Sequence, residues 1–179
     1  MRILAVSPVF PYPPQDGDRI RIYNFLKFLS KRHEISLVTR FRQGEETLRG
    51  KLAGICVKTT LVPISGAEMA FNTALSFFGK MPLTVGAYSG GAMGSAVKKE
   101  AESFRPDIVF AYRLRSAPFC SKSGVPAVID IVDSMALLNT RRQEFERNPA
   151  RLIYGFIDTP RLLSYERALE EEFGAVIVN

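Results

Sequence analysis

Short apolar runs that alternate with amphipathic segments constrain the fold of this chain more than any other feature of its sequence. The runs contain few polar residues, as do strands that are buried on both faces of a parallel sheet. In the segment 19–32, which follows the first run, apolar residues recur at the i, i+3, i+4, i+7 spacing of a helix face. The sequence predicts strands at 2–7, 34–40, 56–64, 107–112, 126–133 and 174–179.

Strands that alternate with helices predict an α/β domain. We expect a Rossmann-like, doubly wound and mainly parallel sheet of about six or seven strands, with helices on both faces. The 179 residues are enough for one domain with a sizeable core. The last helix is expected over 159–173, with Thr159 as its N-cap and Pro160 at its first helical position. The other expected helices lie at 44–54, 67–81, 95–104 and 134–147.

Composition and charge remove several classes of protein from consideration. Two cysteines, Cys56 and Cys120, and the single His33 cannot supply a zinc site or a disulfide framework, so no metal is expected. No apolar run approaches the roughly 20 residues of a membrane-spanning helix, and proline interrupts the N-terminal run too early for a signal peptide. We therefore expect a cytoplasmic protein. The net charge of +6 favours an anionic partner, but the sequence contains no nucleic-acid-binding motif, so no nucleic-acid partner is expected.

Polar side chains follow three of the predicted strands, at the edge where the carboxyl ends of parallel strands meet. In open parallel sheets, ligands bind beyond these ends. The three loops contribute arginines, acidic residues, a tyrosine and a glycine, which together suit an anionic ligand. The candidate binding residues are Gly17, Asp18, Arg19, Arg21, Tyr112, Arg113, Arg115 and Ser134, and Asp133 is the candidate catalytic group.

The first of these loops has both a structural and a functional interpretation. Arg19 and Arg21 open a helix, where positive charge is unfavourable by about 0.3–1 kcal/mol for each residue. Either a bound anion or the flanking Asp16 and Asp18 would compensate for this charge. Gly17 either lets a phosphate approach the helix N–H groups closely or is a plain turn glycine.

The second half of the chain leaves similar alternatives open. Asp133 and Ser134 either serve the site or cap the following helix, whereas Asp130 is expected to serve structure or orient a loop. Glu166 is interpreted either as part of a solvated helix face or as an internal partner of an arginine. The aromatic-rich segment 71–81 is interpreted as core packing, with membrane contact as the alternative.

Two stretches of the chain resemble the N-terminal half of retaining glycosyltransferases of the large family 4 class. The first stretch is the opening, MRILAVSPVFPYPPQDGDRIRIYNFLKFLSKRHEISLVT. In it, a first strand leads to a loop that contains prolines and a glycine, then to a helix, and then to a segment similar to the motif H-x-V-x-L-V-T. The later PAVIDIVDSMALLNTRRQEF and RLLSYERALEEEFGAVIVN carry a D-x-V-D-type strand end and an L-x-x-Y-E-R-type helix. These two features resemble a subgroup of sugar transferases associated with bacterial exopolysaccharide and protein-sorting gene clusters.

The resemblance implies one half of a GT-B fold, with residues 1–179 as the N-terminal, acceptor-side domain. The family's GxGxxxxxL and E-x7-E segments are not in this sequence, so we expect the C-terminal nucleotide-sugar domain to be missing and this domain alone to be inactive. The implied reaction moves a sugar from a nucleotide-sugar, with retention, to a lipid-linked or polysaccharide acceptor. The nucleotide-sugar is a co-substrate, and no other cofactor is implied.

The resemblance also assigns roles to the candidate residues and suggests a location. The loop of Gly17, Asp18 and Arg19 would approach the donor diphosphate, and the loop from Tyr112 to Arg115 would face the acceptor. Asp133 would lie near the reacting sugar, where many relatives carry histidine. The partners would be the missing domain, the two substrates and the periphery of the inner face of the cell membrane.

Two other classes of function compete with this interpretation. One is a non-catalytic Rossmann-like module that binds or senses an anionic ligand through its basic edge. The other is a nucleotide-dependent oxidoreductase, which is disfavoured because no G-x-G-x-x-G follows the first strand.

Overall fold

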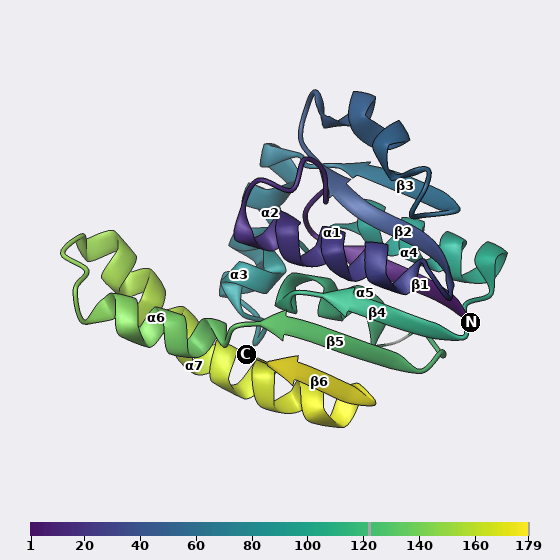
Figure 1. Ribbon diagram of the computed structural model, residues 1–179. Coiled ribbons are helices and arrows are strands. Elements are labelled where there is room, and N and C mark those ends of the chain that lie inside the picture. The colour runs from purple at the N-terminus through teal and green to yellow at the C-terminus, as the bar shows by residue number, and fades with distance from the viewer. Residues whose placement is uncertain (122, 179) are drawn as a thin grey trace.

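The chain folds around one parallel sheet with the strand order β3-β2-β1-β4-β5-β6 (Figure 1). The structure is a computed structural model that describes residues 1–121 and 123–178. Each strand pairs in parallel with its neighbour, which gives the strand order of doubly wound dinucleotide-binding sheets. The predicted Rossmann-like fold is confirmed. The strands are β1 Arg2–Ser7, β2 Glu34–Phe41, β3 Lys58–Pro63, β4 Ile108–Tyr112, β5 Ala127–Val132 and β6 Ala175–Val178. Asn179, the end of the last predicted strand, lies outside the described residues.

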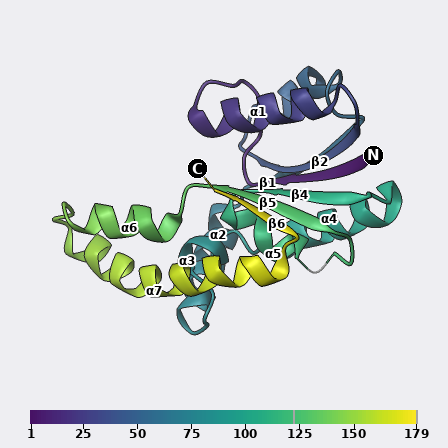
Figure 2. The ribbon, with the colours of Figure 1, turned by 60° about the horizontal axis from the view of Figure 1, so that its bottom comes forward.

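Helices cover both faces of the sheet (Figure 2). The helix α1 lies on one face, and α4, α5 and α7 lie on the other. The helices are α1 Gly17–Leu29, α2 Gly66–Phe77, α3 Leu83–Gly86, α4 Gly91–Phe104, α5 Ala117–Cys120, α6 Met135–Gln143 and α7 Pro149–Glu172, with the 3₁₀ helices η1 Glu45–Leu52 and η2 Leu114–Ser116.

Alternate side chains of β1 enter two separate cores. Ile3 and Ala5 pack in the cluster that contains Ile22 of α1. Leu4 and Val6 point to the opposite face and pack in the cluster that contains α4 and α7 residues. Each such aliphatic side chain, when fully buried, stabilises the fold by about 1.5–3 kcal/mol. Burial on both faces explains why the strands are near-continuous apolar runs in the sequence.

The helix α7 begins ten residues before the position that the sequence predicts. Asn148 is its N-cap, and its Oδ1 accepts hydrogen bonds from the N–H groups of Ala150 (3.0 Å) and Arg151 (3.4 Å). Pro160 therefore lies inside the helix, and the prediction of a helix start at Thr159 is wrong. A proline within a helix removes one hydrogen bond and costs about 3 kcal/mol, so tertiary contacts must hold this helix together.

One such contact is made by Asp158, two residues before the proline. Its carboxylate is fully buried and accepts hydrogen bonds from the N–H groups of Leu83 (2.5 Å) and Thr84 (3.3 Å) at the start of α3. A buried carboxylate needs such partners, and this one ties the first half of α7 to the body of the protein. The helix starts at Pro149, with Asn148 as its N-cap.

The helix α2 does not bury its aromatic face. Phe71 is 64% exposed and Phe78, directly after the helix, is 94% exposed, while Leu75 and Phe77 are also exposed. The interpretation of this segment as core packing is therefore wrong for its largest side chains. The spacing of apolar residues predicts that they share a face, but not which surface that face meets. No helix of the described chain combines the length and the apolar character needed to cross a bilayer.

Candidate functional site

The carboxyl ends of β1, β2, β4 and β5 meet at one edge of the sheet, and Asp130 of β5 is the buried acid at this edge. Its carboxylate, 1% exposed, accepts two hydrogen bonds from Arg21, at 2.8 Å from Nε and 3.2 Å from Nη2. It also accepts the N–H of Val132 at 2.9 Å. The hydrogen bonds to Asp130 raise the pKa of Arg21, against the opposing effect of burial. Asp130 thus has the structural role expected for it, and it holds the guanidinium of Arg21.

Arg19 is also engaged inside the chain. Its side chain is buried, with Nε 3.1 Å from Asp16 Oδ2 and Nη2 2.6 Å from Glu45 Oε1. Asp16 is the N-cap of α1 as well, since its Oδ1 accepts the N–H of Arg19 at 2.9 Å. Carboxylates of the protein therefore compensate for the two arginines that open α1. Compensation by the flanking Asp16 is the structural alternative that the sequence offered. Glu45 and Asp130 are additional partners, which the local sequence does not predict.

Asp18 joins the loop after β1 to the loop after β4. Its carboxylate forms an ion pair with Nη1 of Arg113, and its main-chain carbonyl accepts a hydrogen bond from Tyr112 Oη at 2.9 Å. Burial, followed by the charge of Asp18, raises the pKa of the Tyr112 hydroxyl, which therefore stays protonated and donates. Because β1 and β4 flank the point where the strand order reverses, these contacts span the switch point at which doubly wound sheets bind ligands.

Gly17 and Asp133 are the candidates that remain open to solvent. Gly17 is the first residue of α1, and a Cβ at this position would meet nothing within 4 Å. Val132 has a φ of 68°, which is unusual for a β-branched residue, and the chain turns sharply there. Asp133 follows this turn and is exposed, and its charge contributes to the raised pKa of Arg21.

Ser134 caps the helix α6. Its Oγ accepts the N–H of Leu137 at 3.1 Å and donates to Glu166 Oε2 at 2.7 Å. The other oxygen of Glu166 accepts the N–H of Ala136 at 3.1 Å. The capping interpretation of Ser134 therefore accounts for its contacts. Glu166 is half-buried, and within residues 1–121 and 123–178 it forms no ion pair with an arginine, so the interpretation of it as an arginine partner is wrong.

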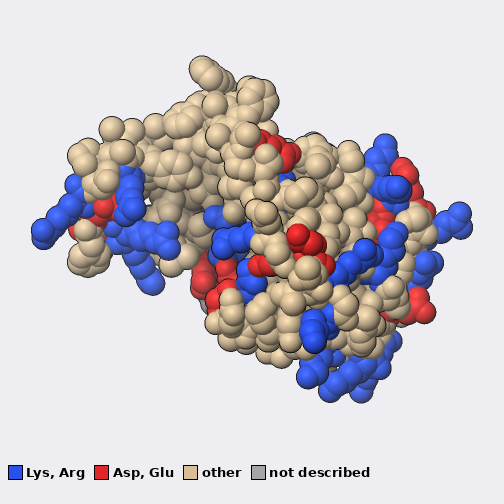
Figure 3. Space-filling view, turned by 90° about the horizontal axis from the view of Figure 1, so that it is seen from above, with Lys and Arg blue, Asp and Glu red and all other residues tan. Residues whose placement is uncertain are grey.

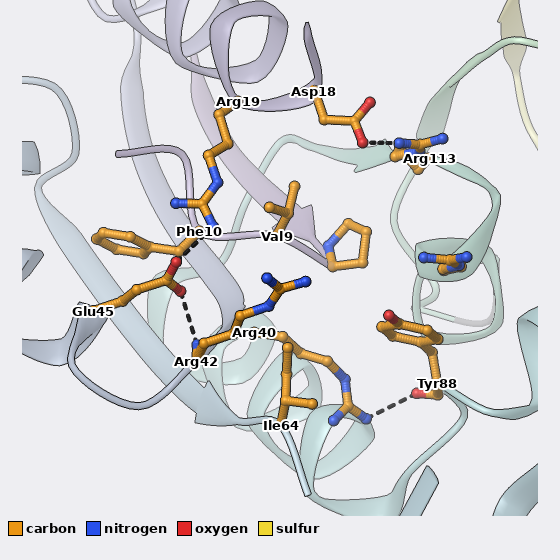
Figure 4. A pocket seen from close by; sticks show the side chains of 12 residues that line it. Val9, Phe10, Asp18, Arg19, Arg40, Arg42, Glu45, Ile64, Tyr88 and Arg113 are labelled. Atoms are coloured by element: carbon orange, nitrogen blue, oxygen red, sulfur yellow. Dashed lines mark hydrogen bonds and ion pairs between the residues drawn. The ribbon is translucent and has the colours of Figure 1, made fainter. Parts of the chain in front are cut away.

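A pocket of about 110 Å³ lies beside this network, over the carboxyl end of β2 (Figure 4). Arg40, the penultimate residue of β2, is 1% exposed and donates from Nη2 to the Tyr88 carbonyl at 2.8 Å. Arg115 extends its guanidinium over the ring of Tyr88, 4.4 Å from the centroid. The residues that line the pocket are Pro8, Val9, Phe10, Asp18, Arg19, Arg40, Arg42, Glu45, Ile64, Tyr88, Arg113 and Arg115.

Four candidate residues, Asp18, Arg19, Arg113 and Arg115, line this pocket together. The sequence predicts that they share one edge, because each follows the carboxyl end of a parallel strand. The sequence prediction did not include the arginines at the end of β2, because it used only the loops after the first, fourth and fifth strands. A signal was present in RFR, where Arg40 and Arg42 alternate at the end of the second strand. Tyr88 comes from the irregular segment before α4 and gave no signal.

The molecule has a second basic region, on the α6–α7 pair that projects from the body (Figure 3). Basic and acidic side chains gather around the hollow between this pair and the body of the molecule. Within residues 1–121 and 123–178, no group of three or more His, Cys, Asp or Glu side chains could hold a metal ion.

Comparison with known proteins adds little to this description. The chain matches no protein-family model and no curated protein. Among solved structures, it is similar to a short-chain dehydrogenase/reductase from Saccharomyces cerevisiae, with 13% sequence identity and a TM-score of 0.44 over 99% of this chain and 70% of that chain. A likeness at this level carries no argument about function, so the site is interpreted from its own chemistry.

Proposed function

We propose that this chain is the acceptor-side domain of a retaining, nucleotide-sugar-dependent glycosyltransferase with GT-B architecture. The observation that supports this function best is the gathering of polar side chains from the loops after β1, β4 and β5 at the switch point of the sheet. The sequence resemblance of the same loops to family 4 glycosyltransferases supports the proposal independently. The acceptor would be lipid-linked or a growing polysaccharide.

The proposed roles follow from which groups remain free. The open N-terminus of α1 at Gly17 offers main-chain N–H groups to the donor diphosphate, as helix N-termini do for phosphates. Asp133 is exposed directly after β5, and its carboxylate accepts a hydrogen bond from a hydroxyl of the acceptor or of the reacting sugar. Arg21 and Arg113 are held by carboxylates, so they position the loops around the site.

In this proposal, catalysis relies on positioning and on charge. The acceptor attacks from the face that the diphosphate leaves, and the leaving diphosphate helps to take the acceptor's proton. The domain then contributes orientation of the acceptor and a fixed field of positive charge. The charge at the site comes from arginines and helix N–H groups, so the proposal needs no metal ion.

The loop after β1 argues against a dinucleotide cofactor. A Rossmann cofactor site requires glycines that let the main chain approach the pyrophosphate. Here the loop reads SPVFPYPPQDG, which contains four prolines and a single glycine and so lacks that pattern. For this reason we do not propose an oxidoreductase.

The exposed aromatic side chains of α2 fit an acceptor that is carried by lipid. Phe71 and Phe78 present apolar rings to solvent, and Lys80 lies two residues after Phe78. Such a combination suits the headgroup region of an anionic membrane. We propose that this face contacts the inner surface of the cell membrane when the acceptor is bound.

The test is glycosyl transfer by the full-length gene product, screened over nucleotide-sugars with lipid-linked and polysaccharide acceptors. Asp133→Asn should lower the transfer rate at least tenfold, which is about 1.4 kcal/mol in the barrier, with an unchanged melting temperature. Glu102→Gln removes an exposed carboxylate from α4 and is the matched control. No transfer from any donor would refute the proposed function. Equal rates for the two variants would refute the role of Asp133.

A further inference from the structure

The pocket over β2 holds more positive charge than the chain neutralises. Five arginines and two carboxylates line it. Asp18 is committed to Arg113, and Glu45 to Arg19. In the described parts of the chain, no carboxylate forms an ion pair with the guanidinium of either of two further lining residues, Arg42 and Arg115.

Arg40 adds a buried charge beneath the pocket. Within the described residues its Nε and Nη1 atoms have no hydrogen-bond partner, and Glu68 Oε2, at 3.8 Å from Nη1, is too distant for a hydrogen bond. A buried arginine whose donors are only partly satisfied is costly for the fold. Its field acts on the pocket through protein rather than water, so screening by solvent is weak. A site that retains such a charge is built to receive an anion.

Tyr88 fixes the arginines on either side of it. The guanidinium carbon of Arg115 lies 4.4 Å from the ring centroid, and that of Arg40 lies 5.8 Å away. Cation–π contacts of this kind hold a guanidinium in place while leaving its N–H groups free to donate. The arginines are thereby ordered before a ligand arrives, which reduces the entropy lost on binding.

The size of the pocket restricts what can enter it. The volume of about 110 Å³ is well below the roughly 300–1,000 Å³ of pockets that enclose drug-sized ligands. A compact polyanionic group fits this space, while an intact nucleotide or sugar would remain outside. Guanidinium groups match phosphate oxygens in pairs of hydrogen bonds, and several arginines together favour a doubly charged group over a carboxylate.

We propose that this pocket is a subsite for a terminal phosphate or diphosphate group of a ligand. Arg42 and Arg115 donate hydrogen bonds to the phosphate oxygens, and Arg40 supplies a fixed positive charge below them. The subsite lies on the β2 side of the edge, apart from Asp133 at the end of β5. The inference goes beyond the proposed function, because it holds whether or not the protein transfers a sugar.

Titration of the full chain with inorganic pyrophosphate, followed by calorimetry at constant ionic strength, tests this subsite. Arg42→Gln and Arg115→Gln should each weaken pyrophosphate binding at least fivefold, and acetate should not bind. Arg49→Gln removes an exposed charge from η1 outside the pocket and should bind as tightly as the unaltered chain. Both pocket variants retain Arg40, so neither removes the buried charge beneath the pocket.

Absence of pyrophosphate binding, or equal binding by all three variants, would overturn the proposal. Two further ligands identify where the phosphate group comes from. Tighter binding of a short isoprenyl diphosphate than of a nucleoside diphosphate would assign the subsite to a lipid-linked acceptor, and the reverse order would assign it to the nucleotide. Failure of the transfer assay with intact pyrophosphate binding would refute glycosyl transfer and leave this subsite standing.

Discussion

Replacement of Asp130 by Asn should destabilise the protein by about 2–3 kcal/mol, because it removes the charge that holds Arg21. The carboxylate of Asp130 is 1% exposed, and it accepts both hydrogen bonds of Arg21 and the N–H of Val132. Removal of one partner from a buried ion pair typically costs about 3–5 kcal/mol. The side chain of Arg21 is 30% exposed, so part of its charge regains water and the cost falls below that range.

Urea unfolding, followed by circular dichroism, measures this change. For a chain of this size each kcal/mol lowers the melting temperature by about 2–4 °C, so the variant should melt roughly 4–12 °C lower. Glu34→Gln is the matched control, because Glu34 forms an exposed ion pair with Arg2 at 3.9 Å. Such surface pairs contribute about 0–1 kcal/mol, and the control should lie near the lower end of that range.

A double-mutant cycle with Arg21→Gln isolates the pair itself. If the two residues act through each other, the double variant is less destabilised than the sum of the single variants, by about 1–2 kcal/mol. Strict additivity, or an Asp130→Asn variant as stable as Glu34→Gln, would contradict the assignment of Asp130 as the acid that organises the edge.

Two further predictions concern alkaline stability and membrane contact. Burial raises the pKa of Cys56 to about 12 from an ordinary value of 9.0, and it also raises the pKa values of Cys120 and Tyr112. The unfolded chain loses these protons first, so the contribution of these groups to the free energy of unfolding should be constant below about pH 8. Above that pH, the free energy of unfolding should fall by about 1.4 kcal/mol per pH unit for each group that is ionised only in the unfolded chain. A flat profile from pH 8 to about pH 10.5 in urea titrations would contradict this prediction. Phe78→Ser should weaken sedimentation with vesicles of anionic phospholipid several-fold, whereas Phe28→Ser, which alters an exposed ring on α1, should not, and equal loss in both would remove α2 as the contact.

The fold could be predicted from the sequence because its signals are local. A strand that is buried on both faces is a run of apolar residues in the sequence. Only a few sheet topologies are compatible with such runs alternating with helices. The start of α7 could not be predicted in the same way. Both Asn148-Pro149 and Thr159-Pro160 satisfy the rules for a helix start, and the contact of Asp158 with α3, more than 70 residues away, supports the earlier one.

The edge at which the candidate residues lie could be predicted from the sequence, but their partners could not. The parallel strands bring their carboxyl ends to one edge, so the location of Asp18, Tyr112 and Arg113 follows from topology. The partners of each charge depend on side chains that are distant in sequence, such as Arg21 and Asp130, which are 109 residues apart. Local pattern carries no information about that choice, so the partner of each arginine could not be predicted from the sequence.

The arginines at this edge fall into two groups, those that are paired with carboxylates and those that are not, and the arginines at the start of α1 belong to the paired group. Arg19 and Arg21 face carboxylates that the fold supplies, so their unfavourable place at the start of α1 requires no ligand. Arg40, Arg42 and Arg115 are the arginines of the edge that carboxylates of the described chain leave unneutralised or held only at a distance. Positive charge available to a ligand is therefore concentrated over β2 rather than at the helix start.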